Sequence, residues 1–145
     1  MDMNVKVKIM HPDAVMPSYE RPGDAGFDLY AVEDVLVYPG CTAIIPTGLA
    51  FEIPDGYELQ IRMRSGASRD TPLIVANAPG TVDAGFRGEV AIIMRNISST
   101  GFTVRKGSRL AQGVISPVVR ATFIRSERLD PSARGGDGFG STGGD

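Results

Sequence analysis

Glycine and proline interrupt this chain roughly every eight to twelve residues, and no other feature limits its possible folds as strongly. There are 18 glycines and 10 prolines, and short runs rich in β-branched residues lie between them. In Tyr57–Arg64 apolar and polar residues alternate, as they do in a strand with one buried face. Many short strands separated by turns predict an all-β fold, and we expect a single-domain, jelly-roll-like barrel or sandwich.

The expected strands follow these β-branched runs, and helical signals are few. Val90–Met94 is apolar at every position, so we expect both faces of this strand to be covered. Ser65–Asp70 has room for a turn or two of helix before Thr71 and Pro72 end it, so the fold has at most one short helix. The runs that we expect to be strands are Val5–Ile9, Val35–Val37, Cys41–Pro46, Leu49–Ile53, Tyr57–Met63, Leu73–Val75, Glu89–Asn96, Phe102–Val104, Leu110–Val119 and Thr122–Ile124.

The last twelve residues, Arg134–Asp145, differ from the rest because six of them are glycine. Such a segment buries too little apolar surface to offset its ordering entropy, and its composition alone also fits a tail without a role. Arg134 offers a forked charge for phosphate and Phe139 a stacking face, which favours a flap that closes on a flat anionic ligand. We therefore divide the chain into a β domain at residues 1–128 and a flexible arm at residues 129–145.

Bulk composition excludes several classes of function. The net charge of −2 gives no general basic surface for nucleic acid, so we expect no nucleic-acid partner. One cysteine and one histidine allow neither an intramolecular disulfide nor a Cys/His zinc site. No run has the length and apolarity of a signal peptide or a membrane span, so we expect a cytoplasmic protein with no membrane partner.

Five polar clusters that contain glycine lie between the expected strands. Each cluster alone is typical of a turn, and the chemistry of their side chains is what links them. Arg64, Ser65 and Gly66 follow a strand and offer a guanidinium, a hydroxyl and backbone amides, which together suit a phosphate. The clusters are Ala25–Ala31, Arg64–Ser68, Asn77–Glu89, Arg109–Gly113 and the C-terminal arm.

The remaining polar residues of these clusters each have a structural and a functional interpretation. Asp83 is either a turn residue or a carboxylate that accepts a proton from water, and Asn77 carries the donors and acceptor of a pyrimidine reader. Phe86 is either a hairpin core residue or a wall for a sugar ring. Asp28 satisfies a local amide or holds a metal-bound water, and Gln112 contacts phosphate or a neighbouring strand.

In their order and spacing, the five clusters resemble the five signature motifs of the trimeric deoxyuridine triphosphate nucleotidohydrolases, the dUTPases. The resemblance covers Pro22 to Gly143, and its specific parts are Gly80–Glu89 and Gly138–Gly143. It implies a jelly-roll homotrimer in which each active site draws on three subunits. It also implies hydrolysis of dUTP to dUMP and pyrophosphate with Mg²⁺, which keeps uracil out of DNA and supplies dUMP for thymidylate synthesis.

The resemblance also implies a role for each matching residue. Asp83 would orient and deprotonate the water that attacks the α-phosphorus, and Asp28 would act through water on the magnesium. Phe86 would pack under the deoxyribose. The residues that would hold the phosphate chain are Arg64, Ser65, Gly66 and, from another subunit, Gln112. The residues that would read uracil are Asn77, Gly80, Thr81, Val82 and Asp83. The arm residues that would close over the nucleotide are Arg134, Phe139, Gly140, Ser141 and Thr142.

One departure from the family pattern bears on specificity. The family usually has tyrosine where Phe86 stands, so the ring is kept and a hydroxyl is lost. We expect weaker discrimination against ribose. Two alternatives stay open from the sequence: a dCTP deaminase of the same fold, and a trimer that binds dUTP and signals to a protein partner without catalysis.

Overall fold

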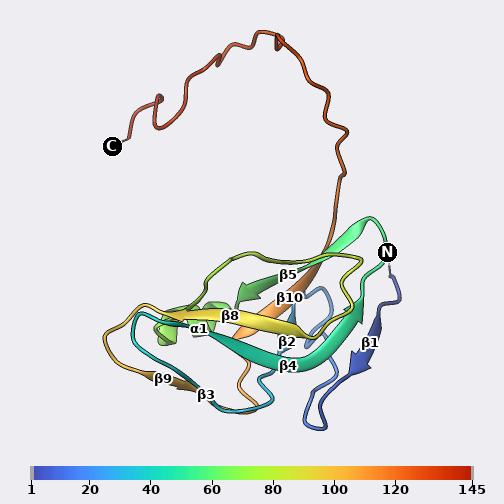
Figure 1. The fold of residues 1–145 in the computed structure, drawn as a ribbon, viewed down its shortest axis with the longest axis vertical. Coiled ribbons are helices and arrows are strands. Elements are labelled where there is room, and N and C mark those ends of the chain that lie inside the picture. The colour runs from blue at the N-terminus through green and yellow to red at the C-terminus, as the bar shows by residue number, and fades with distance from the viewer. Residues whose placement is uncertain (1, 145) are drawn as a thin grey trace.

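The computed structural model describes residues 2–144, which form an all-β body and an extended C-terminal arm (Figure 1). The prediction of an all-β domain with one short helix is confirmed. No helix among residues 2–144 has the length and apolarity needed to cross a membrane. The elements are β1 (Lys6–Ile9), β2 (Phe27–Leu29), β3 (Val35–Val37), β4 (Thr42–Glu52), β5 (Tyr57–Met63), α1 (Ser65–Asp70), β6 (Leu73–Val75), β7 (Gly80–Val82), β8 (Val90–Asn96), β9 (Phe102–Val104) and β10 (Ala111–Pro117).

Two four-stranded antiparallel sheets share one hydrophobic core. The first has the order β1-β4-β8-β6 and the second β2-β10-β5-β7, while β3 and β9 pair separately. Leu59 on β5 and Ile92 on β8 are among the fully buried side chains that join the sheets. Alternation in Tyr57–Met63 therefore has the predicted cause, because Leu59 and Ile61 face the core while Arg62 faces solvent.

β4 is one long strand where the sequence predicts two. The ladder with β8 shifts register between Pro46 and Leu49, and Gly48 adopts a φ of +69° at this irregularity. The Thr47 hydroxyl donates to the carbonyl of Val90 at 2.5 Å, which satisfies a buried acceptor at the break. The predicted interruption at Pro46–Leu49 is thus a bulge inside a strand and not a turn between strands.

β8 is covered on one face only, which corrects the expectation for Val90–Met94. Val90, Ile92 and Met94 are buried, whereas Ala91 and Ile93 remain half-exposed. Ile44 pairs with Ile93 across the ladder and is 64% exposed. Within one chain, the outer face of this sheet is therefore apolar and uncovered.

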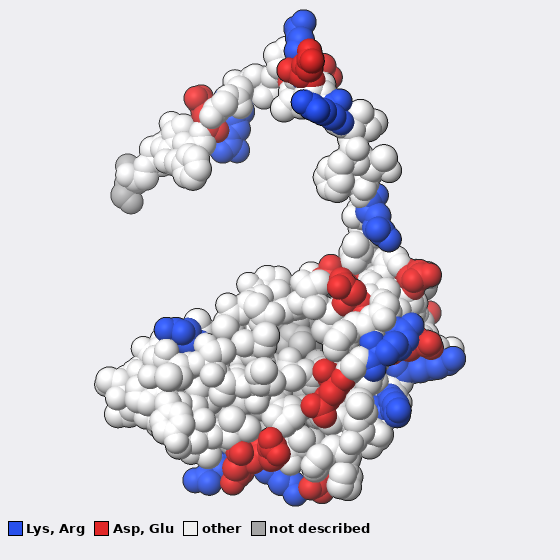
Figure 2. Space-filling model, in the orientation of Figure 1, with Lys and Arg blue, Asp and Glu red and all other residues white. Residues whose placement is uncertain are grey.

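Strand pairing ends at Pro117, and residues 118–144 contain no strand or helix. The predicted strand at Thr122–Ile124 is wrong: Phe123 and Ile124 are 94% and 85% exposed, since no neighbouring strand of this chain lies beside them. The arm leaves the body after β10 (Figure 1) and carries charges of both signs along its length (Figure 2). Its apolar side chains find no burial within the same chain.

Candidate active site

A first pocket, the hairpin pocket, forms around β7 and the loop that follows it. β7 pairs with β5, so that Gly80 faces Ile61 and Val82 faces Leu59. Val82 is buried and fixes the strand, and Asp83 directly follows it at the surface. The pocket has a volume of about 260 Å³ and is lined by Ile44, Ile61, Asn77, Gly80, Thr81, Val82, Asp83, Phe86, Glu89, Val90, Ala91 and Ile93.

The loop after Asp83 is a tight turn that exposes an aromatic ring. The amide of Phe86 donates to the carbonyl of Asp83 at 3.1 Å, and the Arg87 guanidinium donates to the carbonyl of Ala84 at 2.6 Å. The Phe86 ring lies against Gly88, where a β-carbon would overlap it. Phe86 is 44% exposed, so the ring is a wall of the pocket and not a core residue of the hairpin.

Asn77 reaches this pocket from the loop after β6. The amide of Ala78 donates to the carbonyl of Val75 at 3.1 Å, which turns the chain at this point. The Asn77 side chain lies over Gly80, and a β-carbon at Gly80 would sit 3.5 Å from its amide nitrogen and 3.2 Å from the β-carbon of Ile61. Glycine at this position therefore lets an amide side chain approach the β7 backbone closely.

Asp83 has no competing partner in the part of the chain that the structure describes. Among residues 2–144, its carboxylate makes no hydrogen bond or ion pair with another side chain or backbone group. An exposed carboxylate of this kind retains its full capacity to accept hydrogen bonds from water or a ligand.

A second pocket, the arginine pocket, collects residues of three sequence clusters. The ladder of β2, β10 and β5 aligns Asp28 with Gln112 and Gln112 with Arg62, and the Arg64 amide extends it by donating to the carbonyl of Leu110 at 2.9 Å. The pocket has a volume of about 660 Å³ and is lined by Glu20, Arg21, Asp24, Ala25, Gly26, Asp28, Arg64, Ser65, Arg109 and Gln112.

Arg64 is held at two of its nitrogens. Its Nε contacts Oδ1 of Asp28 at 3.0 Å, and one terminal nitrogen donates to the backbone carbonyl of Arg109 at 2.8 Å. Gln112 donates from Nε2 to the carbonyl of Met63 at 3.1 Å. A β-carbon at Gly26 would overlap the Gln112 amide oxygen, so glycine there leaves space for this side chain.

Asp28 lies between two guanidinium groups, which the sequence did not reveal. Its Oδ2 accepts from Arg109 at 3.0 Å while Oδ1 contacts Arg64, and the side chain is 11% exposed. A hydrogen bond with Tyr30, followed by the charge of Asp28, raises the pKa of the Arg109 guanidinium. Arg109 begins the fourth cluster, and this position was the only signal of its role.

The two pockets lie at opposite ends of β5. Since Val82 pairs with Leu59, continuing the ladder places Asp83 beside Glu58, whereas Arg64 follows the other end of the strand. The stretch of extended chain from Glu58 to Arg64 spans about 20 Å. The pockets share no lining residue, and no arm residue lines either of them. One chain therefore does not bring Asp83 and Arg64 together.

The C-terminal end of the arm extends away from the sheets (Figure 1), and none of the predicted arm residues lines either pocket. Phe139 is fully exposed and has a φ of +51°, between Gly138 and a left-handed Gly140 with a φ of +82°. Arg134 donates from Nε to the carbonyl of Asp137 at 2.8 Å. Ser141 and Thr142 are likewise exposed.

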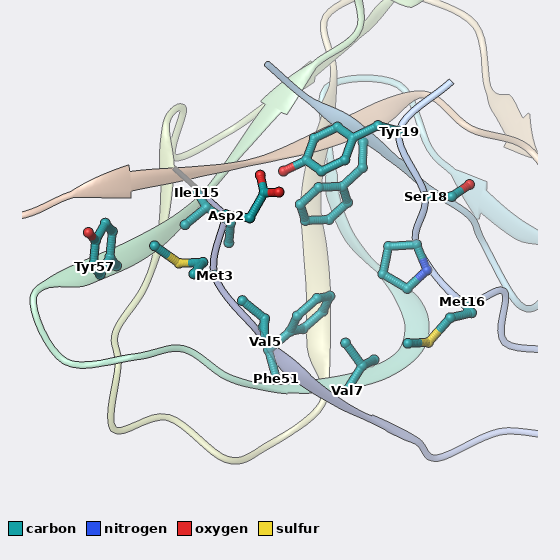
Figure 3. A pocket seen from close by; sticks show the side chains of 12 residues that line it. Asp2, Met3, Val5, Val7, Met16, Ser18, Tyr19, Phe51, Tyr57 and Ile115 are labelled. Atoms are coloured by element: carbon teal, nitrogen blue, oxygen red, sulfur yellow. The ribbon is translucent and has the colours of Figure 1, made fainter. Parts of the chain in front are cut away.

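A third pocket holds none of the predicted site residues. It is an apolar hollow of about 510 Å³ beside the N-terminal strand, where Val5, Val7, Phe51, Tyr57 and Ile115 point toward one another (Figure 3). Its lining residues come from the N-terminal residues 2–7, from the loop residues 16–19 and from β2, β4, β5 and β10. None of the sequence patterns predicted this hollow.

Known proteins are similar to this chain over nearly its whole length. The dUTPase family model matches residues 12–143. A deoxyuridine 5'-triphosphate nucleotidohydrolase of Helicobacter pylori (strain Shi470) is 43% identical over 141 residues, which cover 97% of both chains. One from Nautilia profundicola is 47% identical and covers 97% of this chain and 99% of its own.

Solved structures show the same architecture. The dUTPase of Staphylococcus bacteriophage 80alpha, solved with dUpNHpp, has a TM-score of 0.89 at 30% identity, covering 97% of this chain and 98% of that one. A mutant dUTPase of phage phi11, described with a structural Mg(II) ion, has a TM-score of 0.82 at 26% identity and covers 88% and 99%. This chain thus has the fold of these solved dUTPases. The chain belongs to the dUTPase family.

Proposed function

We propose that this protein hydrolyses dUTP to dUMP and pyrophosphate. The observation that carries the proposal is the hairpin pocket, where an unpartnered carboxylate, an amide side chain and an exposed aromatic ring surround a strand edge. These groups match the parts of a uracil deoxynucleotide. Asn77 and the backbone of Gly80–Asp83 pair with the base, and Phe86 packs under the sugar.

Asp83 acts as the general base in this proposal. Its carboxylate accepts a proton from a water molecule, whose oxygen attacks the α-phosphorus in line and expels pyrophosphate. Arg64, Ser65 and Gly66 hold the phosphate chain with Gln112, and the guanidinium neutralises charge on its oxygens. The freedom of Asp83 from other partners supports this assignment.

We further propose that the active site forms in a homotrimer. The hairpin pocket of one copy, the arginine pocket of a second and the arm of a third then meet at one nucleotide. Three observations support this arrangement: the distance between the two pockets along β5, the uncovered apolar face around Ile44 and Ile93, and the exposed Phe123 and Ile124 in the segment that precedes the arm. Apolar surface of this kind is typical of a face covered by another chain.

The donor set fits a magnesium ion that the triphosphate itself carries. Among residues 2–144 there is no group of three or more His, Cys, Asp or Glu residues that could hold a metal ion. Mg²⁺ usually keeps several waters and binds through one or two carboxylates and substrate phosphates. When bound, it neutralises phosphate charge, and Asp28 would accept a hydrogen bond from one of its waters.

The arm, residues 129–145, closes over the bound nucleotide in this proposal. Phe139 stacks on uracil, and Arg134, Ser141 and Thr142 approach the outer phosphates around Gly140. Closure excludes bulk water and orders the phosphate chain. The full exposure of Phe139 supports this role, because the chain itself offers the ring no burial.

A pyrophosphate-release assay across dUTP, UTP, dCTP and dTTP tests the function. We expect release from dUTP and none from dCTP or dTTP. Release from UTP should be weaker than from dUTP but measurable, because Phe86 lacks the hydroxyl that the family usually has and should discriminate less against ribose. Release of ammonia from dCTP would instead indicate a deaminase. Binding of dUTP without any pyrophosphate release would contradict the proposed hydrolysis.

A further inference from the structure

Arg109 stands out because its backbone contacts Arg64 directly, while its side chain contacts Asp28, which itself contacts Arg64. Its carbonyl accepts a hydrogen bond from Arg64 at 2.8 Å, while its guanidinium contacts Oδ2 of Asp28 at 3.0 Å. Asp28 in turn contacts Nε of Arg64 at 3.0 Å. The three residues form a closed group in which Asp28 is the shared acceptor.

The charges of this group determine what Arg64 can do for an anion. If Asp28 faced Arg64 alone, the carboxylate would cancel the guanidinium charge before a phosphate arrived. With Arg109 on its other oxygen, the group of two arginines and one aspartate keeps a net charge of +1. Glu20 approaches Arg109 at 3.6 Å, but it is 57% exposed and its contribution is screened by solvent.

We propose that Arg109 is a positioning residue for polyphosphate binding, which occupies Asp28 so that the charge of Arg64 remains available to the phosphate chain. This inference rests on the proposed function, since it concerns how the same pocket binds the substrate. Arg109 acts through Asp28 and Arg64 and not by touching the substrate.

The Arg109→Gln substitution separates the role of the side chain from that of the backbone carbonyl. The backbone carbonyl that holds Arg64 is unchanged, whereas the charge that occupies Asp28 is lost. Asp28 then pairs with Arg64 alone. We expect binding of the triphosphate analogue dUpNHpp to weaken about tenfold, while binding of deoxyuridine, which carries no phosphate, stays unchanged.

Two further variants sharpen the comparison. Arg109→Lys keeps the charge but offers a point donor in place of a planar fork, so its affinity for dUpNHpp should lie between those of wild type and Arg109→Gln. Arg105→Gln removes an exposed arginine that pairs with Asp34 at 3.5 Å outside the pocket, and it should bind both ligands as wild type does.

Titration calorimetry and ligand-observed NMR with intact protein measure the affinities of each variant for dUpNHpp and deoxyuridine. Selective loss of dUpNHpp affinity in Arg109→Gln, with partial recovery in Arg109→Lys, supports the inference. Equal binding by wild type and Arg109→Gln overturns it, and so does parallel loss of both ligands, which indicates a structural role only. If Arg109→Gln does not fold, an Arg109→Lys protein with unchanged dUpNHpp affinity at lower stability also overturns it. Wild-type protein that binds neither ligand would overturn the proposed function itself.

Discussion

Asp28 in the arginine pocket and Asp83 in the hairpin pocket differ in burial and in the number of their partners. Asp28 is 11% exposed and lies between Arg64 and Arg109, whereas Asp83 is exposed on a turn and has no partner in the described chain. A carboxylate whose two oxygens each contact a guanidinium group has fewer lone pairs free for water or substrate. The difference supports the proposed division, in which the arginine pocket binds phosphate and Asp83 in the hairpin pocket accepts the proton.

The largest effect should come from removing the free carboxylate. Asp83→Asn keeps the shape of the turn but loses the proton acceptor, so we expect turnover of dUTP to fall by about 10³-fold. Steady-state pyrophosphate release measures this loss. Asp55→Asn, a matched change in the exposed turn before β5, should keep wild-type turnover. Retained activity in Asp83→Asn would exclude Asp83 as the base.

Truncation before Arg134 should give the next largest effect. Residues 134–144 belong to no strand or helix and nearly all are exposed, so the melting temperature should stay unchanged. Turnover should fall by about 10²-fold, because an open site neither orders the phosphate chain nor excludes water. A truncated protein with full turnover would make the arm a tail without a catalytic role.

A smaller effect tests the arginine pocket alone. In Gly26→Ala, the new methyl group would displace the Gln112 side chain, which can swing toward solvent at little cost in stability. We expect KM for dUTP to rise about tenfold with a nearly unchanged kcat, through loss of one phosphate contact. An unchanged KM would indicate that Gln112 does not contact the substrate.

The last prediction concerns the sugar, and its effect should be about as large as that of Gly26→Ala. Phe86→Tyr restores a hydroxyl at the edge of the hairpin pocket, and the ratio of kcat/KM for dUTP over UTP should rise by roughly tenfold. Competition between the two nucleotides measures this ratio directly. A ratio equal to that of wild type would show that the ring alone, and not the hydroxyl, sets the preference for deoxyribose.

Sequence patterns predicted local structure well where one face of a strand is buried. Tyr57–Met63 alternates because Leu59 and Ile61 enter the core, and α1 ends before Pro72 as expected. The bulge in β4 escaped prediction because Gly48 and Thr47 look like a turn until the pairing with β8 is known. Thr122–Ile124 has a strand composition without a partner strand in its own chain.

At the site, too, local features could be predicted from the sequence and long-range contacts could not. Residues of the predicted motifs line both pockets, but the sequence could not show that Arg109 shares Asp28 with Arg64, because that contact joins residues 81 positions apart. It also could not show where the two pockets lie relative to each other. That separation depends on the register of β5 with β7, which is a property of the folded sheet.

The central claim, that one active site combines the pockets of different copies, is tested most directly by mixing two inactive variants. Asp83→Asn and Arg64→Gln chains, unfolded and refolded together in equal amounts, each contribute one intact pocket. If the sites are shared, random mixing gives about a quarter of them both intact pockets, and pyrophosphate release should recover to about that fraction of wild type. No recovery, in a mixture shown to contain both chains in the same oligomer, would place both pockets of each site in one chain and contradict the account.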